Sequence, residues 1–173
     1  MKPAESGCDL DPLELPDALA LVPISDADLP FLERVYASTR TEELAQTDWD
    51  EAQKASFLAF QFHAQHQHYS THYHDAQFFV VEHAGTPAGR LYLHWRKDEL
   101  RIVDIALLPE MRGKGLGGAL LSALMTRARR AGKSVSIHVE QMNPAMQLYV
   151  RLGFAKTGEH GIYHLMEWRP DAL

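Results

Sequence analysis

The sequence predicts an α/β (α+β) domain: a mixed, mostly antiparallel central sheet flanked by helices. Three observations lead to this fold class. Short β-rich runs alternate with segments of helical periodicity along the 173 residues. Two apolar runs at 77–82 and 89–96 flank a Gly- and Pro-containing turn, which indicates a hairpin. An apolar strand at 100–108 runs into a glycine-rich turn that opens a long helix.

The expected order of elements is β-α-α-β-β-β-α-β-α-β-β. Helices are expected at residues 26–38, 49–69, 115–131 and 144–152. Strands are expected at residues 19–24, 77–82, 89–96, 100–108, 134–140, 154–157 and 162–168. Residues 41–47 are expected to form a polar connection, and no internal repeat is visible.

Capping residues delimit these helices. Ser25 or Asp26 suits the start of the first helix, and Asp48 with Glu51 resembles a capping box for the second. The second helix carries apolar residues at spacings of three and four. Gly132 stands at the expected end of the third helix.

Composition indicates one globular domain, expected at residues 18–173. Apolar residues make up 46% of the chain and charged residues 23%, and no apolar run is long enough to span a membrane. The N-terminus lacks the apolar stretch of a signal peptide, so a cytoplasmic protein is expected. Residues 1–17 hold three prolines, five acids and one lysine, and are expected to form a flexible acidic tail that contains the single Cys8.

Charge is divided unevenly along the chain. Residues 1–83 hold 4 Lys or Arg and 15 Asp or Glu, whereas residues 84–173 hold 13 and 8. The net charge of −6 argues against a general nucleic-acid binder. The basic half contains the glycine turn, as a polyphosphate ligand requires, and the acidic half favours a cationic amine as partner. The alternative is that these acids only form solvated faces.

The glycine turn, Arg112-Gly113-Lys114-Gly115-Leu116-Gly117-Gly118, is the most informative segment. A glycine-rich turn at the start of a helix presents backbone N–H groups at the positive end of the helix dipole, which favours phosphate. The spacing lacks the Gly-Lys-Ser/Thr ending of a P-loop. It matches the dinucleotide pattern G-x-G-x-x-G, but the position about 20 residues on, where that pattern needs an acid, is His138.

Two segments together resemble the GCN5-related N-acetyltransferase (GNAT) family. Arg112-x-x-Gly115-x-Gly117 is similar to the family's pyrophosphate-binding signature. Asn143-Pro144-Ala145-Met146-Gln147-Leu148-Tyr149-Val150-Arg151-Leu152-Gly153-Phe154 is similar to its later N-P-A-x-x-L-Y-x-x-x-G-F helix. Locally, Asn143 is a good N-cap, Pro144 suits the first turn and Gly153 suits the helix end. The element order expected above is also that of the family.

The resemblance implies an N-acetyltransferase that moves an acetyl group from acetyl-CoA directly to a primary amine of a small molecule, peptide or protein. It also implies which residues bind acetyl-CoA. These are the strand end Ile105, Ala106 and Leu107, the loop Arg112, Gly113, Lys114, Gly115, Leu116, Gly117 and Gly118, and the later Asn143 and Tyr149. A non-catalytic acyl-CoA-binding module and a dinucleotide-binding oxidoreductase are the alternatives.

Four residues are candidates for proton transfer. Tyr149 has the ordinary phenol pKa near 10, above that of a thiol near 8.5, so it can protonate the leaving thiolate. The resemblance implies the same role, and core packing is the alternative. His138, Glu140 and Asp104 are candidates for the base that takes the amine's proton. Ribosomal-protein acetyltransferases of the family often have Glu at the position of His138, so the assignment stays open.

Five of the ten histidines lie at His63, His66, His68, His72 and His74. Spacings of three and four can place two ligands on one helical face, but no acid or cysteine accompanies them before Asp75. An exposed or acceptor-lining helix end is expected, and no metal. Neither a nucleic acid nor a membrane is expected as partner, and a homodimer is one assembly that the sequence leaves open.

Overall fold

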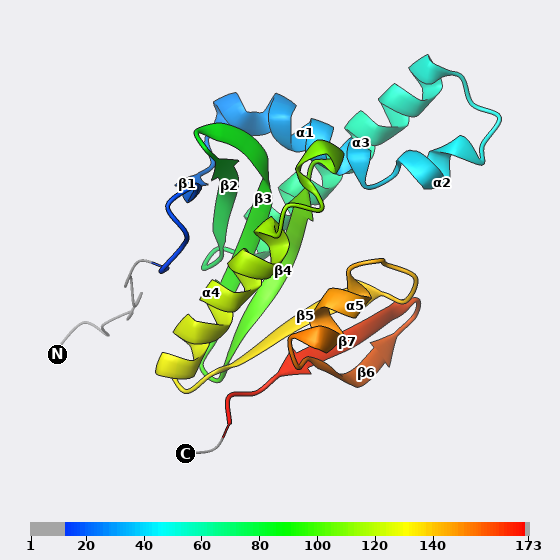
Figure 1. The fold of residues 1–173 in the computed structure, drawn as a ribbon. Coiled ribbons are helices and arrows are strands. Elements are labelled where there is room, and N and C mark those ends of the chain that lie inside the picture. The colour runs from blue at the N-terminus through cyan, green and yellow to red at the C-terminus, as the bar shows by residue number, and fades with distance from the viewer. Residues whose placement is uncertain (1–12, 172–173) are drawn as a thin grey trace, which may run out of the picture.

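The computed structural model describes residues 13–171, and its centre is one seven-stranded sheet (Figure 1). Cys8 and the first twelve residues of the predicted tail lie outside the described residues. The strands are β1 (Leu19–Pro23), β2 (Gln77–His83), β3 (Thr86–Trp95), β4 (Glu99–Leu107), β5 (Ser134–Glu140), β6 (Ala155–His160) and β7 (Tyr163–Trp168). The helices are α1 (Leu29–Ser38), α2 (Thr41–Ala45), α3 (Glu51–His72), α4 (Leu116–Arg130) and α5 (Met146–Arg151). Two 3₁₀ turns, Asp26–Asp28 and Pro109–Met111, precede α1 and α4.

The sheet order is β1-β2-β3-β4-β5-β7-β6. Every neighbouring pair is antiparallel except β4 and β5, which run parallel across the connection made by α4. The prediction of a mixed, mostly antiparallel sheet is therefore confirmed. A dinucleotide-binding fold needs a parallel sheet, so the arrangement does not fit the oxidoreductase alternative.

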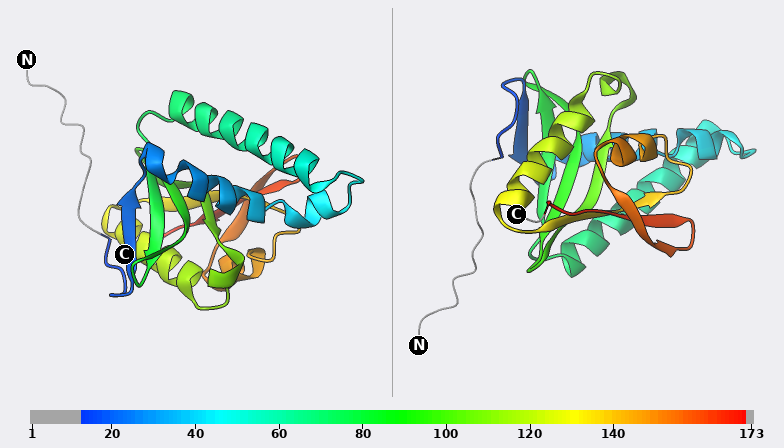
Figure 2. Two further views of the ribbon diagram at one scale, coloured as in Figure 1. Left: turned by 90° about the horizontal axis from the view of Figure 1, so that it is seen from above. Right: turned by 60° about the horizontal axis from the view of Figure 1, so that its bottom comes forward.

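Helices cover both faces of the sheet (Figure 2). The larger core lies under α4 and α5, where leucines of β3 and α4 pack with aromatic residues of the C-terminal segment. A smaller core joins α1 and α3 to β2 through Leu32, Tyr36, Phe62 and Val80. Because side chains alternate along a strand, β3 sends Leu91 to the first core and Arg90 toward the second.

Residues 41–53 differ from the predicted structure in two details. The polar connection at 41–47 contains the short helix α2, which Leu44, 5% exposed, anchors to the protein. The capping box of α3 is formed by Asp50 and Gln53, not by Asp48 and Glu51. The Asp50 carboxylate accepts from the Gln53 N–H at 2.8 Å, and the Gln53 side chain accepts from the Asp50 N–H at 3.0 Å.

Helix α5 is shorter than the predicted 144–152. Asn143 does not occupy the N-cap position, because its side chain accepts from the Ala145 N–H at 2.9 Å one residue before the helix begins. The residues from Asn143 to Ala145 form a turn that leads into α5. Gly153 follows the helix with φ +98°, as expected for a left-handed helix end.

Residues 13–17, which belong to the predicted tail, contact the domain. Leu13 and Leu15 pack on the larger core, and Glu14 pairs with Arg130 of α4 at 2.9 Å. Across residues 13–171, the helices fall short of the combined length and apolar character that crossing a bilayer demands.

Candidate active site

The central feature of the site is the separation of β4 from β5. The two strands pair from Glu99 opposite Ser134 to Ile102 opposite Ile137, and the register ends there. β4 then continues to Leu107 and β5 to Glu140 along diverging paths (Figure 1). Ile105, Ala106 and Leu107 are half-buried along this gap. Their backbone groups on the β5 side lie beyond the last β4–β5 pair, where an extended ligand could pair as an added strand.

Two features of β3 and β4 shape this strand end. Tyr92 pairs with Asp104 but Leu93 pairs with Ile102, so Val103 is an extra residue in β4 and forms a bulge. On β3, Gly89 pairs with Leu107, the last residue of β4. A Cβ added there would lie 2.2 Å from the carbonyl oxygen of Ala106, so glycine lets the two backbones approach. Sequence reasoning missed Gly89, although a glycine inside an apolar strand was the available signal.

The glycine turn follows β4 after the 3₁₀ turn Pro109–Met111. Gly113 and Gly115 have φ +72° and +79°, and an added Cβ at either would meet no atom within 4 Å. Gly115 is the N-cap of α4, whose first N–H groups have no partner within the helix. The Arg112 Nε donates to the carbonyl of Leu107 at 3.1 Å, so its guanidinium stays beside the strand end. The turn therefore offers an open cradle for an anion.

Tyr149 lies on α5, across the gap from β4. Its side chain is 4% exposed and its ring meets Phe154 edge-on at 5.5 Å. Burial, and then the nearby Asp104 carboxylate, raise the pKa of Tyr149 above its ordinary value. The phenol thus stays protonated at neutral pH, and Asp104 lies near enough for its charge to act on it. The structure brings Tyr149, Asp104 and the strand end together.

His138 and Glu140 lie two residues apart on the exposed face of β5. Arg101 approaches the Nδ1 of His138 at 3.0 Å, and a guanidinium can only donate. The neutral imidazole therefore carries its proton on Nε2. Burial and the charge of Arg101 lower the pKa of His138 below its ordinary value.

The family follows from a match of sequence. The sequence model described as the Acetyltransferase (GNAT) family matches residues 38–154. This chain belongs to the GNAT acetyltransferase family. The match contains α3, the glycine turn and most of the strands and helices around the gap.

Individual GNAT relatives resemble this chain less completely. The mycothiol acetyltransferase of Corynebacterium aurimucosum is 33% identical over 100 residues, which are 51% of this chain and 33% of that protein. The chain thus spans about a third of the length of that relative. An N-alpha-acetyltransferase of Sulfurisphaera tokodaii is 29% identical over 128 residues, 64% of this chain and 77% of that protein.

Solved GNAT structures show the same fold. The crystal structure of the PaiA N-acetyltransferase from Thermoplasma acidophilum, in complex with coenzyme A, superposes with a TM-score of 0.66. The alignment covers 88% of this chain and 99% of that one at 19% sequence identity. At this identity the likeness concerns the fold alone.

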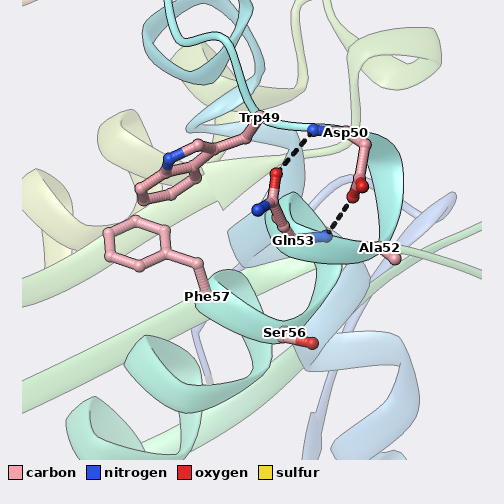
Figure 3. Close-up of a pocket in the computed structure, with 6 residues that line it drawn as sticks. All are labelled: Trp49, Asp50, Ala52, Gln53, Ser56 and Phe57. Carbon is pink, nitrogen blue, oxygen red and sulfur yellow. Dashed lines mark hydrogen bonds between the residues drawn. The ribbon is translucent and has the colours of Figure 1, made fainter.

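A surface hollow opens where α2 leads into α3 of this GNAT domain (Figure 3). Trp49 is 39% exposed, and its ring meets that of Phe57 edge-on at 4.9 Å. The Asp50 and Gln53 side chains beside it form the capping box of α3. Asp50 is the acid among the lining residues, and Glu42, Glu43, Asp48 and Glu51 are exposed acids close to it in the sequence.

The histidines of α3 are spread along the helix. His63 lies 3.8 Å from Glu33, while His68 and His72 stack at 4.4 Å. Between residues 13 and 171, histidine, cysteine and acidic side chains form no group of three or more that could hold a metal ion. The alternative in which two of these histidines hold a metal on one helical face thus gains no further ligand from the described part of the chain.

Proposed function

We propose that this chain is an acetyl-CoA-dependent N-acetyltransferase that transfers the acetyl group directly to a primary amine. One observation carries the proposal: the gap between β4 and β5 has the open glycine turn at its end and the buried Tyr149 beside it. A ligand with a polyphosphate end and a narrow extended arm fits this arrangement. Membership in the GNAT family supports the same donor.

The donor would be held at two places. Backbone N–H groups of Gly113 to Gly118 and the charges of Arg112 and Lys114 would bind the pyrophosphate. Ile105 to Leu107 would pair their free backbone groups with the extended arm. A backbone N–H at that strand end would polarise the thioester carbonyl. Asn143 acts on the turn before α5, where its side chain holds the Ala145 N–H.

The chemistry requires an acid and a base. Tyr149 would donate its proton to the thiolate as the amine attacks the carbonyl, since its phenol remains protonated. The geometry disfavours His138 as the base, because the lone pair of its neutral ring is occupied by Arg101. Glu140 and Asp104 provide the carboxylates that can take up the amine's proton, directly or through water.

The acceptor would be a cationic amine that approaches from the side of α2 and α3. Asp50 lines the Trp49 hollow there, exposed acids precede and follow it in the sequence, and an aromatic face also attracts cations. The relatives named above are an N-alpha-acetyltransferase and a mycothiol acetyltransferase. Both protein N-termini and small amines are therefore in the acceptor class that we propose.

A turnover assay with Tyr149→Phe tests the proposal. The wild type is assayed with acetyl-CoA against small amines, polyamines, aminoglycosides and peptides with free N-termini. We expect product with at least one amine, and a kcat reduced roughly 10²–10⁴-fold in Tyr149→Phe with the acetyl-CoA affinity little changed. Acetyl-CoA binding without any product would identify a non-catalytic module. Wild-type turnover by Tyr149→Phe would limit that residue to packing.

A further inference from the structure

Arg90 is a buried charge in the middle of the apolar strand β3. Its side chain is 3% exposed, between the fully buried Leu91 and Gly89. A guanidinium taken out of water is costly unless its partners compensate, and replacing a whole buried ion pair by apolar residues is often neutral or stabilising. Arg90 is therefore a residue whose presence stability alone does not account for.

The partners of Arg90 come from each element around it. Its Nη2 donates to the Asp104 carboxylate of β4 at 2.5 Å and to the Gln65 side chain of α3 at 3.2 Å. The guanidinium lies between two rings, Tyr36 of α1 at 5.8 Å and Tyr92 of β3 at 5.2 Å. The planar group thus connects both helices of one face to the sheet at a single point.

The ion pair is asymmetric in its exposure. Asp104 is 18% exposed and Arg90 is 3% exposed, so the cation is enclosed and the carboxylate is partly accessible. Arg90 binds the Oδ2 of Asp104. Within residues 13–171, Asp104 has no second cation and its Oδ1 accepts no hydrogen bond. Arg90 therefore fixes one oxygen and leaves the other presented.

The presented oxygen lies at the point where the reaction is expected. Asp104 is two residues beyond the last β4–β5 pair and one residue before Ile105, where the donor-binding strand end begins. The bulge at Val103 sets the side on which Asp104 emerges. Its carboxylate is also the charge that acts on Tyr149, from the opposite side of the gap.

We propose that Arg90 is a positioning residue that holds Asp104 as the anchor for the acceptor, and that the acceptor binds as an ammonium ion. This inference rests on the proposed function and names the substrate class of the same site. An ammonium group has three donors, and the free Oδ1 of Asp104 accepts one of them. The Arg90 guanidinium, which lies near the Tyr36 and Tyr92 rings, holds the Asp104 Oδ2 through its Nη2.

The test compares Arg90→Met and Asp104→Asn with Arg169→Met, which also removes one positive charge, but from an exposed side chain that pairs with Glu167. Spermidine and a peptide with a free N-terminal amine are the probes. Their affinity is measured by calorimetry on the coenzyme A complex, and their KM and kcat by turnover. We expect Arg90→Met and Asp104→Asn to weaken amine binding about 10- to 100-fold. Acetyl-CoA affinity should change less than about twofold, and Arg169→Met should resemble the wild type.

Two further variants separate positioning from folding. The double variant Arg90→Met/Asp104→Asn should bind amines no worse than Asp104→Asn alone, because Arg90 acts through Asp104. Arg90→Lys should restore part of the affinity, and it carries the test if Arg90→Met does not fold. Unchanged amine affinity in folded Arg90 variants would overturn the inference. Absence of acetyl transfer by the wild type would instead overturn the proposed function, because the binding measurement does not depend on turnover.

Discussion

Gly89→Ala should damage the strand end that binds the donor. The added Cβ would lie 2.2 Å from the Ala106 carbonyl oxygen, 2.9 Å from a Leu107 methyl and 3.0 Å from the Leu107 Cα. The Leu107 methyl can rotate away, but the carbonyl oxygen belongs to the β4 backbone. Relief therefore requires β3 and β4 to move apart where Gly89 pairs with Leu107.

The size of the effect follows from these contacts. Overpacking in a tight interior costs about 1–3 kcal/mol, and a backbone obstacle places this case near the upper limit. Moving the strands apart also weakens the adjoining bond in which the Leu108 N–H donates to the Ala88 carbonyl at 2.9 Å. A loss of about 3 kcal/mol in a domain of this size lowers Tm by roughly 6–12 °C.

Thermal unfolding with and without acetyl-CoA measures both consequences. Gly158→Ala in β6 is the matched control, because its added Cβ would meet Leu165 no closer than 3.7 Å. That change should alter stability by less than about 1 kcal/mol. Gly89→Ala should also shift less on adding acetyl-CoA, because Ala106 and Leu107 are displaced. A Gly89→Ala melting temperature within about 2 °C of the wild type, with a normal acetyl-CoA shift, would refute the expected loss of about 3 kcal/mol.

Three further predictions concern the donor, the pH dependence and the acceptor. Gly115→Glu should abolish the acetyl-CoA melting shift by placing bulk and charge in the cradle, whereas Gly132→Glu, also at positive φ in open space, should retain it. Because the pKa of His138 is lowered, the unfolded chain binds its proton more readily, so unfolding scans should show stability falling as pH drops below 6.5. His138→Gln should make that fall shallower, and an unchanged slope would contradict it. A variant with four acidic residues replaced by their amides should have a raised KM for the amine, more at low salt than at high salt. Its substitutions are Glu42→Gln, Glu43→Gln, Asp48→Asn and Asp50→Asn. An unchanged KM would show that these acids only form a solvated face.

The order of elements and the sheet type could be predicted because local patterns determine them. The strand Ser134–Glu140 has the predicted bounds, and the glycine turn and α4 lie where the spacing placed them. Errors arose where neighbouring residues offer equivalent signals. Asp48 and Asp50 are both good caps, and the structure uses Asp50 because Gln53 returns a hydrogen bond to it.

The partners of the catalytic candidates could not be predicted, because they depend on register. Asp104 and Arg90 are 14 residues apart, and they meet because a bulge places Asp104 opposite Tyr92. Arg101 reaches His138 across the parallel pair of β4 and β5. Nothing local to His138 indicates that its lone pair is occupied. The roles of Tyr149, Glu140, Asp104 and the donor-binding residues remain predictions until the variants are measured.

The short parallel ladder between β4 and β5 has a consequence for cooperativity. Four residue pairs connect a sheet of β1 to β4 with a sheet of β5 to β7. Without donor, backbone amides of residues 103–107 on the open side should exchange with deuterium faster than those paired to β3. A donor arm bridging the gap would continue the ladder, so exchange there should slow. The two halves of the sheet should then unfold as one unit when the ligand is bound and more independently when it is not.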